Sequence, residues 1–221
     1  ITAMASGGGN APRMAVGTAD GEVLFLKVGT TTEFTDRGER RKRPHIRAGQ
    51  PIPLTKSPIV RLAYRANDHE SLLALVSKGG RLLVVRIAAD DVAGQHPIIT
   101  ELPQPRGAVT ALALDALLEN LYVGTADGQV VHVALSETES PEMRAAYTVA
   151  APSTAVTTLG FLSGDRSLVV MSEDGAVSTW GLVRRANAPS GWTLTRIHTL
   201  RAHNAPVTAF APSQRVKGFV T

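Results

Sequence analysis

A tight-turn signal of the Asp-Gly or Gly-Gly type recurs four times along the chain at long, similar intervals. The clearest copies are the identical segments Gly-Thr-Ala-Asp-Gly at residues 17–21 and 124–128. Weaker copies at residues 77–80 and 172–175 complete the set. Self-similarity with a period of about 20 to 50 residues is typical of repeat architectures. The glycines of the four turns, Gly21, Gly80, Gly128 and Gly175, lie 59, 48 and 47 residues apart.

Each turn separates two apolar runs, which predicts a β-hairpin. Asp-Gly and Gly-Gly suit type I′ turns, in which both central residues have positive φ. The run after the glycine is apolar at alternate positions, as in Leu24, Leu26 and Val28, and the positions between are largely apolar too. A strand with this pattern is covered on both faces.

An aspartate recurs at the same place in three of the turns. We expect Asp20, Asp127 and Asp174 to have a structural role in the turns rather than a catalytic one, because Asp accepts the left-handed conformation and caps its own backbone.

A second marker has the same period. A run containing Val-Thr or a similar pair precedes each hairpin, and its aligned valines Val60, Val109, Val156 and Val207 are spaced 49, 47 and 51 residues. Each period then holds four short strands, which is the composition of a propeller blade. The sequence predicts an all-β fold, a β-propeller of about four blades. A long β-sandwich is the structural alternative, since sandwiches also contain many short strands.

The whole of residues 1–221 is expected to be a single propeller fragment, with about three full blades flanked by two partial ones. The longer first interval is explained by a surface loop over residues 36–53, rich in basic residues, Pro and Gly. The chain has no obvious start and resembles a piece of a longer protein. We expect further blades in that parent, or a homodimer formed through open edge strands.

The hairpins and first strands resemble WD40 repeats. Residues 200–207, Leu-Arg-Ala-His-Asn-Ala-Pro-Val, are similar to the Gly-His element of that family, with His203 as its histidine. Trp180-Gly181 stands where the family has Trp-Asp, and the inner-turn Asp is matched by Asp20, Asp127 and Asp174. The resemblance implies a WD40-like β-propeller, with His203 in a structural hydrogen-bonding role. Because the other Trp positions hold Leu or Val, the family's buried polar network is expected to be partial.

A narrower resemblance is to the WD40-like extracytoplasmic domain of bacterial phosphate ABC transporter permeases. It is carried by residues 196–221 and by the Gly-Thr-Ala-Asp-Gly turns. It implies a periplasmic domain of an inner-membrane parent that acts in phosphate import, with a phosphate-binding protein or other transporter subunits as partner. The alternatives are a cytosolic WD40-like scaffold that binds proteins and, with less weight, a propeller enzyme with its site in the central channel.

Basic charge is concentrated in one segment. Residues 33–47 hold six Arg or Lys against three acidic residues, which accounts for +3 of the net charge of +4. The run Arg40, Arg41, Lys42 and Arg43 is a candidate site for an anion or a partner, and a solvated loop is its plainer interpretation. Nucleic-acid binding is not expected, because the run lacks interleaved aromatic residues and is not extended elsewhere.

Other chemistry finds little support in the sequence. The six histidines show no metal-ligand spacing, and there is no cysteine, so no metal site is expected. No Gly-x-Ser-x-Gly elbow or phosphate-binding loop occurs. We therefore expect a domain that is not an enzyme and has no cofactor.

Overall fold

The computed structural model describes residues 1–7, 13–88, 96–135, 142–148, 154–187, 191–201, 203–213, 216 and 218–221. All regular structure in these residues is β, so the prediction of an all-β fold is confirmed. Every sheet is antiparallel and its strands follow chain order, apart from one short added strand. This meander is the arrangement of a propeller blade rather than of a sandwich. The chain divides into two compact units, Ile1–Glu101 and Leu102–Thr221.

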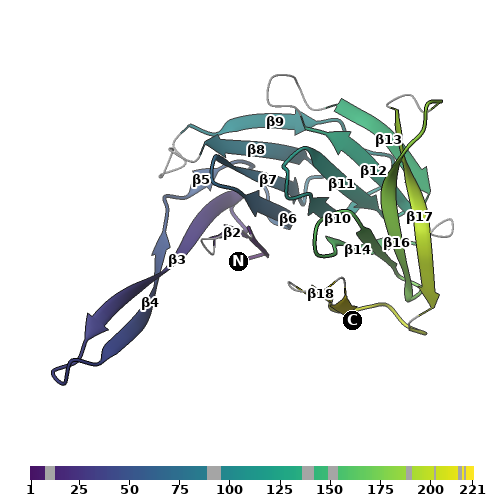
Figure 1. Cartoon of the computed structure of the whole chain (residues 1–221). Helices are drawn as coiled ribbons and strands as arrows, with labels where there is room; N and C mark the ends of the chain where they lie inside the picture. The colour runs from purple at the N-terminus through teal and green to yellow at the C-terminus, as the bar shows by residue number, and fades with distance from the viewer. Residues whose placement is uncertain are drawn as a thin grey trace. The chain divides into compact units, whose positions relative to one another are not determined.

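The first unit contains two sheets (Figure 1). The N-terminal sheet has the order β1-β2-β3-β4, and β5 pairs with β3. It is more complete than the partial blade expected at the start of the chain. The second sheet has the order β6-β7-β8-β9. The strands are β1 (Ala3–Ser6), β2 (Arg13–Gly17), β3 (Glu22–Phe34), β4 (Arg40–Ala48), β5 (Ile52–Pro53), β6 (Ile59–Ala66), β7 (Glu70–Ser77), β8 (Leu82–Ala88) and β9 (Ile98–Leu102).

The second unit contains two four-stranded sheets, β10-β11-β12-β13 and β14-β15-β16-β17, and the two-stranded sheet β18-β19. The strands are β10 (Val109–Leu114), β11 (Asn120–Thr125), β12 (Gln129–Ala134), β13 (Glu142–Thr148), β14 (Val156–Phe161), β15 (Leu168–Ser172), β16 (Ala176–Arg184), β17 (Trp192–Arg201), β18 (Ala211–Pro212) and β19 (Phe219–Val220). The sheets begin and end close to the four periods expected from the repeat. The prediction of one continuous propeller fragment over 1–221 stays a prediction.

The hairpin turns differ from the predicted type I′. In each of the four turns the glycine has positive φ, between 81° and 86°, but no aspartate does. The amide of Gly21 donates to the Thr18 carbonyl, and the amide of Thr18 donates to the Glu22 carbonyl. This is a three-residue loop, a type I turn closed by a left-handed glycine. Because the glycine supplies the positive φ, the residue before it can keep a right-handed α backbone conformation.

A β-bulge recurs in the first strand of three sheets. The register shifts after Ile59 in β6, after Val109 in β10 and after Val156 in β14. Ile59 is therefore the structural counterpart of the two valines, and the sequence alignment of Val60 with them is one residue out of step. Ile59 and Val156 are fully buried, whereas Val60 is half-buried.

The cores are mainly aliphatic, in keeping with the low aromatic content of the chain. Glycines in the repeat allow close packing: a Cβ on Gly124 would lie 2.7 Å from Val156, and one on Gly17 would lie 2.8 Å from Ile59. The first-unit core consists of Ala15, Val23, Leu54, Ile59, Tyr64, Leu73, Leu75, Leu83, Val85 and Ile87. The main second-unit core consists of Ala111, Ala113, Tyr122, Val130, Val156, Leu159, Phe161, Leu168, Val170, Trp180 and Leu194. Leu162, Val169, Met171, Val177 and Val207 form a smaller one.

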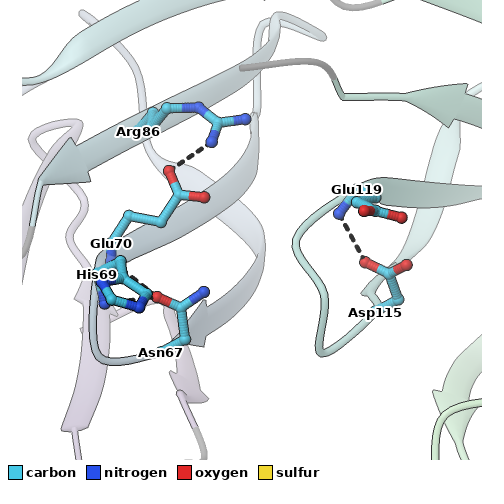
Figure 2. A network of polar contacts seen from close by, with 6 residues as sticks. All are labelled: Asn67, His69, Glu70, Arg86, Asp115 and Glu119. Atoms are coloured by element: carbon cyan, nitrogen blue, oxygen red, sulfur yellow. Dashed lines mark hydrogen bonds and ion pairs between the residues drawn. The ribbon is translucent and has the colours of Figure 1, made fainter.

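Polar networks anchor a turn in each unit (Figure 2). In the first unit, the Asn67 side chain accepts hydrogen bonds from the amides of His69 and Glu70, both at 2.8 Å. Glu70 in turn forms an ion pair with Arg86 on the next strand. In the second unit, Asp115 accepts from the amide of Glu119 at 3.0 Å. Asp115 is also bonded to the Asn120 side chain, at 2.6 Å.

We expect the substitution Arg86→Met to lower the free energy of unfolding by about 1–3 kcal/mol. The Glu70 and Arg86 side chains are only 15% and 17% exposed, so removing one charge leaves the other poorly solvated. The control is Arg81→Met, because Arg81 pairs with Glu101 at an exposed position and its loss should have no measurable effect. Urea denaturation followed by circular dichroism checks both variants. Equal stability of the two variants would contradict this account of the Glu70–Arg86 pair.

Candidate partner-binding surface

The basic segment is a β-hairpin rather than the expected loop over residues 36–53. Arg40–Ala48 forms β4, which pairs with the second half of β3 from Leu26 to Phe34. The turn between them is again a three-residue loop, with Gly38 at φ 76°. The hairpin extends beyond the other strands of its sheet (Figure 1). No residue from Lys27 to Arg47 is buried, so this arm, which we define as residues 27–47, adds nothing to the core.

Cross-strand register divides the arm into two faces, because directly opposed residues project to the same side. Glu33 opposes Arg41, Thr31 opposes Arg43, and Lys27 opposes Arg47. We call this side the arginine face; it comprises Lys27, Thr31, Glu33, Arg41, Arg43, His45 and Arg47. The opposite side we call the mixed face; it comprises Val28, Thr30, Thr32, Phe34, Arg40, Lys42, Pro44 and Ile46.

Contacts between side chains agree with this division. On the arginine face, the Thr31 hydroxyl lies 3.4 Å from His45 Nδ1, and an Arg43 nitrogen lies 3.6 Å from a Glu33 oxygen. The Arg43 side chain is 76% exposed, so this ion pair is weak and leaves the guanidinium accessible. On the mixed face, Phe34 is 72% exposed and Ile46 is 67% exposed. Exposed apolar side chains beside cations are suited to a protein partner.

The charge of the arm equals the net charge of the chain. Residues 27–47 hold seven Lys or Arg and three Asp or Glu, a balance of +4, and the whole chain also carries +4. The remainder of the chain is therefore neutral overall. The predicted residues Arg40 to Arg43 fall on alternating faces of one strand, and Lys27 and Arg47 join the arginine face. Arg47 could not be assigned to a face from the sequence because residues 36–53 were expected to form a loop. Lys27 lies outside that range, and its place on the arginine face depends on its pairing with Arg47.

The predicted turn residues lie at the hairpin ends, where their side chains bond locally. The Thr125 hydroxyl donates to the carboxylate of Asp127, and the Ser172 hydroxyl donates to Asp174 at 2.5 Å. In the first turn Asp20 is exposed, and the Thr18 hydroxyl accepts from the Glu22 amide at 3.1 Å. These contacts are local to each turn and gather no carboxylates into one site.

The two residues matched to WD40 signature positions lie in different surroundings. Trp180 is buried in the main second-unit core, and its ring nitrogen donates to the Ser178 hydroxyl at 2.8 Å. His203 is exposed, and its Nε2 lies 2.7 Å from the Thr221 hydroxyl.

Burial raises the pKa of Tyr122 in the main second-unit core, with a further contribution from the Asp115 charge. Within the described ranges, no group of three His, Asp or Glu side chains could hold a metal ion.

Comparison of the fold with solved structures gives WD40 propellers. The chain superimposes on the β-propeller domain of Cps50 (Swd1) from Myceliophteria thermophila with a TM-score of 0.58 and 17% identity, covering 90% of this chain and 58% of that one. The superposition on Sqt1 from Chaetomium thermophilum has a TM-score of 0.60 and 18% identity, and it covers 90% of this chain and 46% of Sqt1. The fold is that of a WD40 β-propeller. This chain spans about half the length of these structures.

A further solved structure is Sqt1 of Chaetomium thermophilum bound to the N-terminus of the ribosomal protein L10, with a TM-score of 0.56 and 18% identity. The superposition covers 90% of this chain and 49% of the Sqt1 chain. No protein-family model matches the sequence. No curated protein matches it either.

These findings correct the narrower interpretation of the sequence. The predicted phosphate-transporter domain, inner-membrane parent and periplasmic location are wrong, because the WD40 fold is shared with Swd1 and Sqt1 and nothing ties it to a permease. In the part of the chain that the structure describes, no helix is long and apolar enough to cross a membrane. The misleading signal was residues 196–221 together with the repeated turns. Those features belong to WD40-like blades in general and do not distinguish one protein that carries them from another.

Proposed function

We propose that this chain is a non-catalytic protein-binding module and that the β3–β4 arm contacts its partner. The observation that carries the proposal is the arm itself: two paired strands, all exposed beyond Thr30, that hold the net charge of the chain. Chains do not maintain a long exposed ribbon for stability, because two strands alone bury too little surface. A role in recognition explains the arm better.

The comparison with Sqt1 supports a protein as the partner class. One Sqt1 structure holds the N-terminus of a ribosomal protein, so a WD40 propeller of this fold binds a polypeptide segment. At 18% identity the likeness concerns the fold, and the partner of Sqt1 is not carried over to this chain. The proposal for this chain rests on the exposed arm.

The test is a shortened arm. Replacing residues 30–44 by Asn-Gly leaves Gly29 and His45 as the closing pair of a two-residue hairpin. We expect the melting temperature to change by less than about 2 °C, because no buried side chain is removed. Affinity capture from the native cells, followed by titration of each captured protein in purified form, should show partners that bind the full chain and lose binding to the shortened one. Partners that bind both chains equally would overturn the proposal for the arm.

A further inference from the structure

We propose that the arginine face of the arm binds an extended acidic segment of a partner protein, with carboxylates at alternate residues. This inference rests on the proposed function and specifies its chemistry. Arg41 and Arg43 are two residues apart on β4, and Arg47 is four residues further. At about 3.4 Å per residue, Arg41 and Arg43 are separated by about 7 Å along the strand, and Arg43 and Arg47 by about 14 Å. An extended peptide has the same rise, so its alternate carboxylates stay in register with them.

Arginine suits this task because its planar guanidinium binds a carboxylate through two parallel hydrogen bonds. Three of the four cations on this face are arginines, and Lys27 is the fourth. Among the paired residues of this face Glu33 is the one acidic residue, and it lies opposite Arg41 and beside Arg43. The face therefore keeps an excess of positive charge toward Arg47 and Lys27. A peptide can place a neutral residue opposite Glu33.

The hydrogen-bond pattern of the arm disfavours strand addition at the open edge of β4 and so favours recognition by side chains. The Thr35 amide donates to the Glu39 carbonyl, and the Gly49 amide donates to the Phe25 carbonyl. Counting from these two bonds, the even-numbered residues of β4 turn their backbone groups toward its open edge. Pro44 stands in the middle of that set and has no N–H to donate. Proline and cations on an edge strand discourage pairing with another strand.

A protein is favoured over nucleic acid by the other residues of the arm. Glu33, Asp36 and Glu39 lie among the seven cations, where they would repel a phosphate backbone that carries charge at every nucleotide. The exposed Phe34 and Ile46 on the mixed face offer apolar contacts that a phosphate backbone cannot use. Base stacking would require more than one exposed aromatic ring on the arm.

The experiment uses the full chain and a dye-labelled twelve-residue probe of alternating Glu and Thr, with the Gln-Thr peptide as control. Fluorescence anisotropy at about 50 mM salt should show saturable binding of the Glu probe alone. Binding should weaken at about 150 mM salt, where charges are screened beyond about 8 Å. The matched variants are Arg41→Gln/Arg43→Gln on the arginine face and Arg40→Gln/Lys42→Gln on the mixed face. Both pairs remove two positive charges from the same strand.

We expect the arginine-face pair to weaken binding of the probe by at least about tenfold and the mixed-face pair by less than about threefold. Equal weakening would overturn the inference, since net charge alone would then explain binding. A twenty-base-pair DNA duplex that binds more tightly than the peptide would also overturn it, as would the absence of saturable peptide binding. The shortened arm separates the two proposals: a purified partner that requires the arm but ignores the arginine-face pair leaves the proposed function standing and removes this inference.

Discussion

Replacing Gly175 by alanine is expected to lower the free energy of unfolding by about 2–5 kcal/mol. Two costs add at this position. Gly175 has a φ of 81°, where a side chain is strained by about 1–3 kcal/mol. A Cβ there would also lie 2.5 Å from the carbonyl oxygens of His203 and Ala205, and these backbone atoms cannot turn aside as a side chain would. The β15–β16 turn or the segment before β18 must then move.

The matched control is Gly164→Ala in the preceding turn of the same sheet. Gly164 has a φ of 88°, but an added Cβ would meet nothing within 4 Å. This variant should therefore show only the conformational cost, about 1–2 kcal/mol. Thermal and urea denaturation followed by far-ultraviolet circular dichroism measure the difference. If both variants lose the same stability, the close approach at Gly175 has no energetic weight and this interpretation of the turn glycine fails.

The substitution Trp180→Ala is expected to cost about 3–5 kcal/mol, because it opens a large cavity in the main second-unit core. Trp180 is 7% exposed and also donates to Ser178, and its ring lies 5.8 Å from the Arg196 guanidinium. The hydroxyl of Ser178 would lose a donor, which adds a polar cost.

Trp192→Ala is the control for this second prediction. Trp192 lies on β17 of the same sheet but is 45% exposed, so its loss should cost less than about 1 kcal/mol. Since these are the two tryptophans of the chain, each variant removes half of the fluorescence signal, and circular dichroism is the better probe. A similar loss in both variants would show that Trp180 does not hold the core together.

The repeat allowed much of the fold to be predicted. Hairpin turns and alternating apolar runs are local signals, so β11 and β12 around Gly128, or β15 and β16 around Gly175, could be found from residue types alone. The bulge after Val109 and Val156 could not, because it depends on how the first strand pairs with the second. For this reason the sequence pattern alone aligns Val60, rather than its neighbour Ile59, with the two valines.

The structure of the arm could not be predicted from its sequence. Residues 40–43 are all basic and contain no apolar residue, and Pro44 directly after such a run of charge is typical of a loop. The pairing with β3 is nevertheless regular over nine residue pairs, since Pro44 falls where its missing N–H would face the open edge. The candidate residues Arg40 to Arg43 were found from their charge, but their division between two faces required the register.

Hydrogen exchange measured by mass spectrometry, on the full chain alone and saturated with its purified partner, shows whether the arm is the binding surface. We expect protection on binding to be confined to the arm, residues 27–47, where exposed strand amides exchange readily in the free chain. Protection at the hairpin turns around Gly21, Gly80, Gly128 or Gly175, with the arm unchanged, would contradict it and place the binding surface elsewhere on the fold.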